Sequence, residues 1–453
     1  MNRIIKKVAV LGSGVMGSRI ACHFANIGVQ VMLLDIVPMQ LTDDEKKNPT
    51  LRNKLVNDSL QAAIKQNPSP VYAQKVIKLI TTGNFDDDLQ KIKDVDWIVE
   101  VVIENLEIKQ QLFEKVDALR KPGTLITSNT SGIPIHQMII GRSDDFKQHF
   151  CGTHFFNPPR YLKLLEIIPT PLTDKSVVDF LMDYGDRFLG KTTVLCKDTP
   201  AFIANRIGVY SIMAVFNVME KLGLSIDEVD ALTGPISGRP KSATFRTADV
   251  VGIDTLVKVA KNTYADCPND ESRDMFIVPA YVEKLIENKW LGDKTGNGFF
   301  KKVKNAEGKS EIHVLNLKTF EYTPSAKAKF ATVDAAKQID DVKSRIKALH
   351  HGTDKAGDFY RNVTALVNKY VSFRIPEIAD ELYKIDDAVK AGFGWELGPF
   401  ETWDVLGVEK TAQMMEASGF APAAWVKDMS DAGNKSFYNT GDGKRKFYDV
   451  GTK

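Results

Sequence analysis

The sequence predicts an α/β protein in which a doubly wound sheet is followed by two related all-α helical domains. Three observations lead to this fold class. Short apolar segments alternate with helical segments up to about residue 197, the pattern is helical almost throughout beyond that point, and two pairs of similar segments recur in the helical part. We therefore expect three domains, at residues 1–197, 198–320 and 321–453.

The chain begins with a predicted strand–helix–strand unit. Residues 7–12 and 31–35 are short apolar runs that are typical of buried parallel strands. Apolar residues at helical spacing fill the segment 14–28, and Gly28 is placed to end that helix. Residues 36–80 are mostly polar and make a longer excursion than a crossover needs. The alternation then continues, with strands expected at 97–102, 124–127, 153–156, 164–168 and 193–196 and helices at 106–119 and 177–188.

A change of pattern near residue 197 marks the expected start of the helical part. Asp198 or Thr199 can cap a helix, and Pro200 can occupy its first turn. We therefore expect one long helix that runs from this point to about Leu222.

Two pairs of segments in the helical part indicate an internal duplication. Residues 202–205 (Phe-Ile-Ala-Asn) resemble residues 359–362 (Phe-Tyr-Arg-Asn), 157 positions later. Residues 245–252 (Phe-Arg-Thr-Ala-Asp-Val-Val-Gly) resemble residues 400–407 (Phe-Glu-Thr-Trp-Asp-Val-Leu-Gly), 155 positions later. Because both pairs occur in the same order at nearly the same separation, they favour two related helical units. Residues 301–355 would connect these units.

The composition is that of a soluble globular protein. Hydrophobic residues make up 43% of the 453 residues and charged residues 26%. The net charge of +2, from 60 basic and 58 acidic residues, provides no global field for nucleic acid or an anionic membrane. We expect no membrane insertion, and a cytoplasmic location is the default. The four cysteines lack paired spacing and are expected to be reduced thiols rather than metal ligands: Cys22, Cys151, Cys196 and Cys267.

A glycine-rich turn follows the first predicted strand. Residues 12–17 have the sequence Gly-Ser-Gly-Val-Met-Gly, and Asp35 ends the second strand. In a Rossmann-type domain, the glycines allow a tight turn and a close approach of the pyrophosphate to the helix N-terminus. Asp35 is placed to accept hydrogen bonds from the adenosine ribose, and its charge would repel the 2′-phosphate of NADP. The sequence therefore predicts NAD as the cofactor, and the alternative is a simple glycine turn with a capping aspartate.

A histidine and a glutamate on two neighbouring predicted strands could form a general base. Oxidation of a secondary alcohol needs a group that takes the hydroxyl proton, and a neutral imidazole is suited to this near pH 7. His154 and Glu166 could pair if their strands lie side by side, and the carboxylate would then orient the ring. The alternative is an ordinary core histidine.

Two further polar residues are candidates for contact with a substrate. Ser131 follows the strand at 124–127, at the carboxyl end where open α/β sheets bind ligands. Asn205 lies near the start of the long helix and could donate to a substrate carbonyl. The alternatives are a helix cap for the Ser-Asn-Thr-Ser segment and an interhelical hydrogen bond for Asn205.

Seven ordered segments of this sequence resemble the 3-hydroxyacyl-CoA dehydrogenase family, and the likeness runs through the whole chain. The segments are Gly-Ser-Gly-Val-Met-Gly (12–17), Glu-Asn-Leu-Glu-Ile-Lys (104–109), Ser-Asn-Thr-Ser (128–131), His-Phe-Phe-Asn-Pro (154–158), Lys-Leu-Leu-Glu (163–166), Lys-Asp-Thr-Pro-Ala-Phe-Ile-Ala-Asn-Arg (197–206) and Leu-Gly-Pro-Phe-Glu (397–401).

The resemblance implies an NAD-dependent oxidation of (3S)-3-hydroxyacyl-CoA to 3-ketoacyl-CoA in fatty-acid β-oxidation. It implies that His154 is the general base, that Glu166 orients it, and that Ser131 and Asn205 position the 3-oxygen and the thioester region. Lys54 and Lys65 are candidates for the CoA phosphates. The implied NAD-binding residues are Gly12, Gly14, Val15, Met16, Gly17, Asp35, Glu104, Lys109, Ser131, Asn157 and Lys294, the last five of which match positions near the nicotinamide half.

The chain departs from the short form of this family in two ways. It carries two helical units, as the long forms do, so the second unit is expected to replace a partner subunit in a pseudo-dimeric monomer. Residues 234–244 also replace the Gly-Pro-Phe-Glu type of turn, which only the second unit keeps, at 398–401. Long relatives often carry an enoyl-CoA hydratase module, so such a module or a thiolase is an expected partner. The alternative functions are a dehydrogenase of a small 3-hydroxy acid and a non-catalytic binding protein that retains the fold.

Overall fold

The computed structural model describes residues 3–441 and 443–452. The chain divides into two compact units, Met1–Phe202 and Ile203–Lys453. The division lies five residues beyond the predicted boundary at residue 197. No helix of the described residues is long and apolar enough to cross a membrane.

The first unit is built on an eight-stranded sheet with the strand order β3-β2-β1-β4-β5-β6-β7-β8. Neighbouring strands run parallel except β6 and β7, which are antiparallel. The first six strands follow the 3-2-1-4-5-6 order of a Rossmann fold, so the predicted doubly wound sheet is confirmed. The strands are β1 Lys7–Leu11, β2 Gln30–Asp35, β3 Ile80–Asn84, β4 Trp97–Glu100, β5 Leu125–Ser128, β6 Phe150–Phe155, β7 Leu164–Pro169 and β8 Thr192–Leu195.

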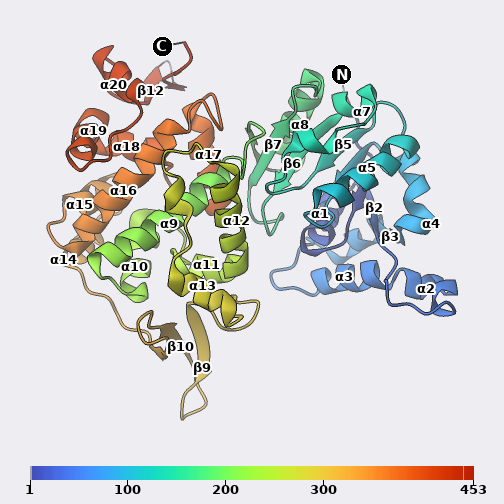
Figure 1. The fold of residues 1–453 in the computed structure, drawn as a ribbon, viewed down its shortest axis with the longest axis horizontal. Helices are drawn as coiled ribbons and strands as arrows, with labels where there is room; N and C mark the ends of the chain where they lie inside the picture. Colours follow the sequence, from blue (N-terminus) through green and yellow to red (C-terminus); the bar gives the residue numbers. More distant parts are fainter. Residues whose placement is uncertain (1–2, 442, 453) are drawn as a thin grey trace. The chain divides into compact units, whose positions relative to one another are not determined.

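Helices cover both faces of this sheet (Figure 1). The helices α1 (Val15–Asn26), α3 (Lys54–Ile64) and α8 (Lys175–Arg187) contribute to one apolar cluster with the strands. The opposite face carries three aromatic rings in mutual contact, Phe113 of α5 (Leu106–Leu119), Phe146 of α7 (Asp144–Gln148) and Phe150 of β6. The remaining short helices are η1 Glu45–Lys47, α2 Pro49–Arg52, η2 Gln74–Leu79, α4 Phe85–Asp88, η3 Leu89–Asp94 and α6 Ile135–Met138.

The edge strand β3 is an element that sequence reasoning missed. It lies at the end of the excursion predicted for residues 36–80 and pairs with β2. Its sequence, Ile-Thr-Thr-Gly-Asn, contains only one apolar side chain. Because an edge strand has a neighbour on one side only, it does not need the apolar run by which buried strands are recognised.

The predicted start of the long helix was wrong. The helix α9 runs from Ala204 to Leu222, and the preceding Ala201 and Phe202 have positive φ angles of 61° and 50°. Asp198 does not cap it, because the Asp198 carboxylate accepts hydrogen bonds of 2.8 Å from Ile135 N and His136 N at the start of α6. Asp198 therefore caps α6 rather than α9, and Pro200 lies in the turn before α9.

The second unit is helical with two small antiparallel sheets (Figure 1). Its first half contains α9, α10 Ile226–Thr233, η4 Pro235–Ser237, α11 Phe245–Val251, α12 Ile253–Asp266, η5 Arg273–Phe276 and α13 Ala280–Glu287. The connection contains β9 Phe300–Lys304, β10 Ser310–Leu315, β11 Tyr322–Pro324, α14 Ala331–Ala336 and α15 Val342–His351. Its second half contains α16 Lys355–Phe373, α17 Leu382–Phe393, α18 Pro399–Leu406, α19 Val408–Ala417, α20 Ala424–Asp431, β12 Tyr438–Gly441 and β13 Lys444–Phe447.

The two halves repeat a buried carboxylate at the start of a short helix. Asp230 accepts a hydrogen bond of 2.8 Å from Phe245 N at the start of α11. Asp386 accepts a hydrogen bond of 3.0 Å from Phe400 N at the start of α18. The two aspartates are 156 positions apart, which matches the separation of the similar sequence segments.

A second pair of aspartates repeats a longer-range contact. Asp249 accepts hydrogen bonds from the backbone N–H groups of Phe299 and the next residue, both at 2.9 Å. Asp404 accepts them from Phe437 and the next residue, at 2.7 and 2.9 Å. In each half, the phenylalanine whose N–H donates to the aspartate also packs edge to face against a second phenylalanine. The ring centroids are 4.7 Å apart for Phe299 and Phe245 and 5.0 Å apart for Phe437 and Phe400. Shared hydrogen bonds and ring geometry support the duplication that the sequence indicates.

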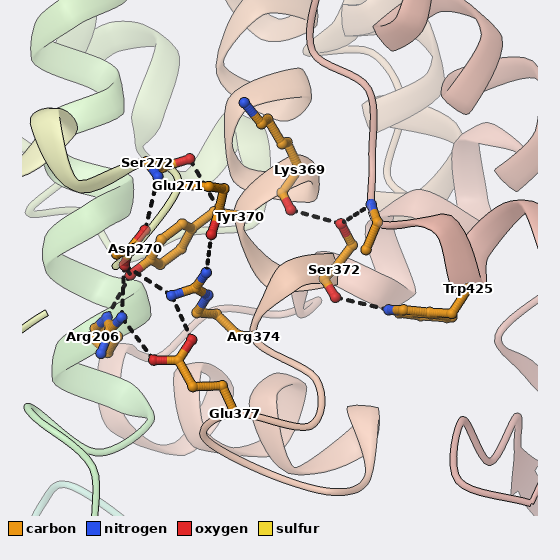
Figure 2. Close-up of polar contacts among 11 residues, drawn as sticks. Arg206, Asp270, Glu271, Ser272, Lys369, Tyr370, Ser372, Arg374, Glu377 and Trp425 are labelled. Carbon is orange, nitrogen blue, oxygen red and sulfur yellow. Dashed lines mark hydrogen bonds and ion pairs between the residues drawn. The ribbon is translucent and has the colours of Figure 1, made fainter. Parts of the chain in front are cut away.

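A buried ionic cluster joins the two halves (Figure 2). Arg206 of α9 and Arg374, which follows α16, both contact Asp270, at 2.7 and 2.8 Å. The hydroxyl of Tyr370 donates to the same carboxylate at 2.9 Å, and Glu377 lies 3.1 Å from Arg206. Burial opposes the charge of Asp270, but the two arginines help to hold its pKa below the usual value. The cluster therefore links the halves through compensated charges.

Candidate active site

The glycine-rich turn has the geometry that its sequence predicts. Gly12 has φ of +108°, and a Cβ there would lie 2.6 Å from the Val101 carbonyl oxygen. A Cβ on Gly17 would lie 1.8 Å from the Gly12 carbonyl oxygen, so helix and strand approach too closely for a side chain. A Cβ on Gly14 would meet no atom within 4 Å, so the space above this residue is open. The turn thus leaves room for a group that approaches the backbone.

The N-terminus of α1 opens onto this turn. Gly14 is its N-cap and provides no side-chain cap, so the N–H groups of Val15 and Met16 are available to an anion. Asp35, at the end of β2, accepts hydrogen bonds from Ser13 N at 2.5 Å and from Ser13 Oγ at 2.6 Å. The N-terminus of α1 can therefore bind an anion, and it lies beside a carboxylate that can accept hydrogen bonds from hydroxyl groups. This combination fits a dinucleotide.

His154 and Glu166 lie opposite each other on the antiparallel strands β6 and β7. The His154 Nδ1 atom is 2.7 Å from Glu166 Oε2, and both side chains are buried. Because the carboxylate accepts a hydrogen bond, Nδ1 carries the proton and Nε2 carries the lone pair. The ring lies beside two phenylalanines, with centroid distances of 4.6 Å to Phe156 and 5.7 Å to Phe202.

A carboxylate network ties the ends of β4 and β5 together. Glu104 Oε1 accepts hydrogen bonds from Thr130 Oγ1 at 2.6 Å and from Ser131 N at 3.0 Å. The Lys109 ammonium lies 3.4 Å from Glu104 and 2.7 Å from the buried Glu100. Burial opposes the charge of Glu104, but Lys109 and the hydrogen-bond donors of the 130–131 loop hold its pKa below the usual value. Three of the predicted residues, Glu104, Lys109 and Ser131, are therefore in direct contact.

Two residues that sequence reasoning missed hold this arrangement in place. Glu100 is fully buried at the end of β4, and it binds Lys109 and accepts from Val102 N at 2.7 Å. Burial raises the pKa of Glu100. Asn129 Oδ1 accepts from Phe155 N at 2.9 Å, which anchors the Ser-Asn-Thr-Ser loop beside the strand of His154. An acidic residue inside an apolar strand was the available signal for Glu100.

The other predicted site residues lie apart from these contacts. The Asn157 amide oxygen accepts from the Arg19 guanidinium of α1. Lys54 pairs with Asp58 on α3, and Lys65 is exposed at the end of that helix. Asn205 is the second residue of α9, and Lys294 pairs with Asp254 at 2.7 Å, both in the second unit. The roles of these residues stay predictions.

A Rossmann sheet with an open glycine turn and a carboxylate at the end of β2 places the first unit among the NAD-binding domains of dehydrogenases. Comparison with known proteins supports this class. The family model described as the NAD binding domain of 3-hydroxyacyl-CoA dehydrogenase matches residues 7–199, and the model of the C-terminal domain of the same family matches residues 202–302.

Similar proteins extend the match beyond these two regions. A probable 3-hydroxyacyl-CoA dehydrogenase of Bacillus subtilis is 48% identical over 457 residues, covering all of this chain and 57% of that protein. A probable 3-hydroxyacyl-CoA dehydrogenase of Deinococcus radiodurans is 46% identical and covers 67% of this chain and 85% of that protein. The crystal structure of 3-hydroxybutyryl-CoA dehydrogenase from Escherichia coli shares the fold, with a TM-score of 0.67, 21% identity and coverage of 95% of this chain and 99% of that one.

The chain belongs to the 3-hydroxyacyl-CoA dehydrogenase family. The predicted family, the NAD cofactor and the oxidoreductase class are thereby confirmed. The chain spans 57% of the length of its Bacillus subtilis relative.

Proposed function

We propose that this chain oxidises (3S)-3-hydroxyacyl-CoA to 3-ketoacyl-CoA with NAD. The observation that carries the proposal is the buried hydrogen bond of 2.7 Å between His154 and Glu166 in the NAD-binding unit of a 3-hydroxyacyl-CoA dehydrogenase family member. This pair supplies what an alcohol dehydrogenation needs beyond the cofactor, namely an oriented base.

His154 is the proposed general base. With the proton held on Nδ1 by Glu166, the Nε2 lone pair takes the proton of the 3-hydroxyl group. Glu166 then stabilises the imidazolium without accepting the proton itself, as carboxylates do beside catalytic histidines. Phe156 and Phe202 limit the access of water to the ring. Ser131 and Asn205 are proposed to position the 3-oxygen and the thioester region.

NAD supplies the hydride acceptor when bound. Gly12, Gly14 and Gly17, together with the N–H groups of Val15 and Met16, are proposed to hold its pyrophosphate. Asp35 is proposed to bind the adenosine ribose, while Glu104, Lys109, Ser131, Asn157 and Lys294 are proposed to surround the nicotinamide half. Lys54 and Lys65 remain candidates for the CoA phosphates.

The test is the reverse reaction, followed by NADH absorbance with acetoacetyl-CoA as the substrate. NADPH and free acetoacetate serve as controls for the cofactor and for the thioester. We expect turnover only with NADH and the thioester. Turnover with free acetoacetate would favour a small 3-hydroxy acid as the substrate, and a protein that binds NADH without any turnover would favour a binding role.

We further propose that the reaction serves fatty-acid β-oxidation. The step before it must hydrate a 2-enoyl-CoA, and the step after it must cleave a 3-ketoacyl-CoA, so a hydratase module and a thiolase are the expected partners. The Bacillus subtilis relative extends beyond the part that this chain matches, which leaves room for a further module in such proteins. Co-purification of either activity with the full-length protein tests this proposal.

A further inference from the structure

A cavity in the second unit is lined by none of the residues proposed for catalysis or NAD binding. It has room of about 80 Å³, compared with roughly 10–15 Å³ for one water molecule on the same measure. The wall is formed by α10, α15, α16, α18 and the loops that carry Arg239 and Trp395. The lining side chains include Leu349, Phe359, Val363, Val367, Arg239 and Asn368.

Arg239 is the only ionised side chain that lines this cavity, and neither Asp nor Glu is among the described lining residues. Its guanidinium lies 4.1 Å from the centre of the Trp395 ring. Within the described part of the chain, no carboxylate pairs with it and no acceptor takes a hydrogen bond from it, whereas the nearby Arg345 donates to the Ile236 carbonyl at 2.8 Å. Burial lowers the pKa of Arg239 to about 10, which still leaves it charged at neutral pH. The cavity therefore contains a positive charge that no carboxylate of the described residues pairs with.

A second lining residue also lacks a partner. Asn368 of α16 is 1% exposed, and its Nδ2 atom has no hydrogen-bond partner among the described residues. Buried side-chain donors are nearly always satisfied in folded proteins, so an orphaned amide on a cavity wall indicates a missing acceptor. Asn368 and Arg239 are both among the residues that line this cavity.

The histidine of the cavity adds no second charge. Burial lowers the pKa of His350 to about 4, so the ring is neutral at pH 7. Its Nδ1 donates to the Ile346 carbonyl at 2.9 Å, and its Nε2 accepts from Thr364 Oγ1 at 2.7 Å. A single cation in a mainly apolar cavity suits a ligand with one negative charge and an apolar body better than a doubly charged phosphate.

We propose that this cavity is a binding site for a small amphipathic monocarboxylate. Its carboxylate pairs with Arg239, one of its oxygens accepts from Asn368, and its aliphatic part lies against Phe359 and Val363. The site is distinct from the proposed dehydrogenase site, since none of the residues that line it is among those proposed for catalysis or NAD binding.

Isothermal titration of the 453-residue chain with hexanoate tests the proposal, with the neutral hexanamide as the matched probe. We expect hexanoate to bind and hexanamide to bind at least about 10-fold more weakly, since a charge-assisted pair is lost. Arg239→Gln should weaken hexanoate binding by at least about 10-fold, while Arg187→Gln, an exposed arginine of α8, should leave it unchanged. Weaker binding in the Arg239 variant but not in the Arg187 control would assign hexanoate binding to this cavity rather than to an acyl site elsewhere in the chain.

Two further variants distinguish the loss of a binding contact from a folding defect. Arg239→Lys keeps the charge and should retain part of the affinity. Asn368→Leu removes the orphaned donor, so it should weaken hexanoate binding without lowering the melting temperature. Absence of hexanoate binding at millimolar concentration, equal affinity for hexanoate and hexanamide, or unchanged affinity in a folded Arg239→Gln protein would each overturn the proposal.

Discussion

At the scale of single residues, the proposed chemistry depends on the proton position of one imidazole. His154→Gln keeps a side chain that can hydrogen-bond to Glu166 but removes the base. Loss of a general base costs roughly 100- to 10,000-fold in turnover, so we expect kcat with acetoacetyl-CoA to fall by about that factor. Binding of NADH, measured by its fluorescence, should stay within about twofold, since His154 is not part of the glycine turn. Near-normal turnover in this variant would contradict the proposed mechanism.

A second histidine makes stability depend on pH. His23 of α1 is buried, with Nε2 3.1 Å from the Leu189 carbonyl oxygen, and burial lowers its pKa to about 3. Its ordinary pKa is 6.5, so its contribution to stability is complete above pH 6.5 and declines as the pH falls toward 3. In His23→Gln the amide can still donate to Leu189 but does not titrate.

The measurement for His23 is a comparison of free energies of unfolding. Denaturant titrations of both proteins at pH 7.5 and pH 4.5 give the difference between wild type and variant at each pH. We expect the advantage of wild type to shrink by about 3 kcal/mol at the lower pH, since pH 4.5 lies two units below the ordinary pKa of 6.5 and each unit corresponds to about 1.4 kcal/mol. A difference that does not change with pH would show that His23 does not titrate as the structure indicates.

Sequence reasoning placed the candidate residues that follow strands. The ends of parallel strands meet at one edge of a sheet, so Asp35 and the 128–131 segment could be placed from the strand pattern alone. The hydrogen bond between His154 and Glu166 needed the antiparallel register of β6 and β7, which the sequence does not specify. Glu100 was missed because the role of a buried acid depends on a lysine from a different element.

At the scale of elements, apolar periodicity identified those with a buried face. The helix expected at 106–119 has these bounds in α5, since Asn105 caps it by accepting from Ile108 N and apolar residues recur at helical spacing. The start of α9 was misplaced because a capping residue can serve any helix within reach, and Asp198 serves α6. Local sequence does not distinguish these two helices.

The repeated aspartates of the second unit allow a matched test. Each of Asp249 and Asp404 accepts two backbone hydrogen bonds, and asparagine would offer only one acceptor oxygen and turn an N–H group toward the other donor. An unsatisfied buried donor costs about 1–3 kcal/mol, so we expect a loss of that size from Asp249→Asn and a similar loss from Asp404→Asn. Asp334→Asn, at an exposed side chain of α14, is the control and should change stability by less than about 0.5 kcal/mol.

Urea unfolding followed by far-ultraviolet circular dichroism measures all three variants. Similar losses for the two repeated positions would indicate that each half is stabilised by the same local contact. A loss in one variant only, with the other as stable as the control, would contradict this view of the duplication.

At the scale of the whole molecule, the second unit contains an interface between its own halves. The helices α9 and α16 pack against each other, and the rings of Tyr210 and Tyr370 stack with their centroids 3.6 Å apart and nearly parallel. The ionic cluster around Asp270 lies at the same junction (Figure 2). At this junction α9 is thus covered by a helix of the same chain.

This internal interface predicts the oligomeric state of the 453-residue chain. Since α9 is already covered by α16, an identical second chain has no equivalent face to bind, and we expect a monomer of 50.4 kDa. Sedimentation velocity over a concentration series from about 0.1 to 50 μM measures this directly, because a dimer of ordinary affinity would dissociate within such a range. One sedimenting species with the monomer mass throughout would agree with the pseudo-dimeric arrangement. A species of twice that mass at the lowest concentration would mean that another surface joins two chains and that the second half does not replace a partner subunit.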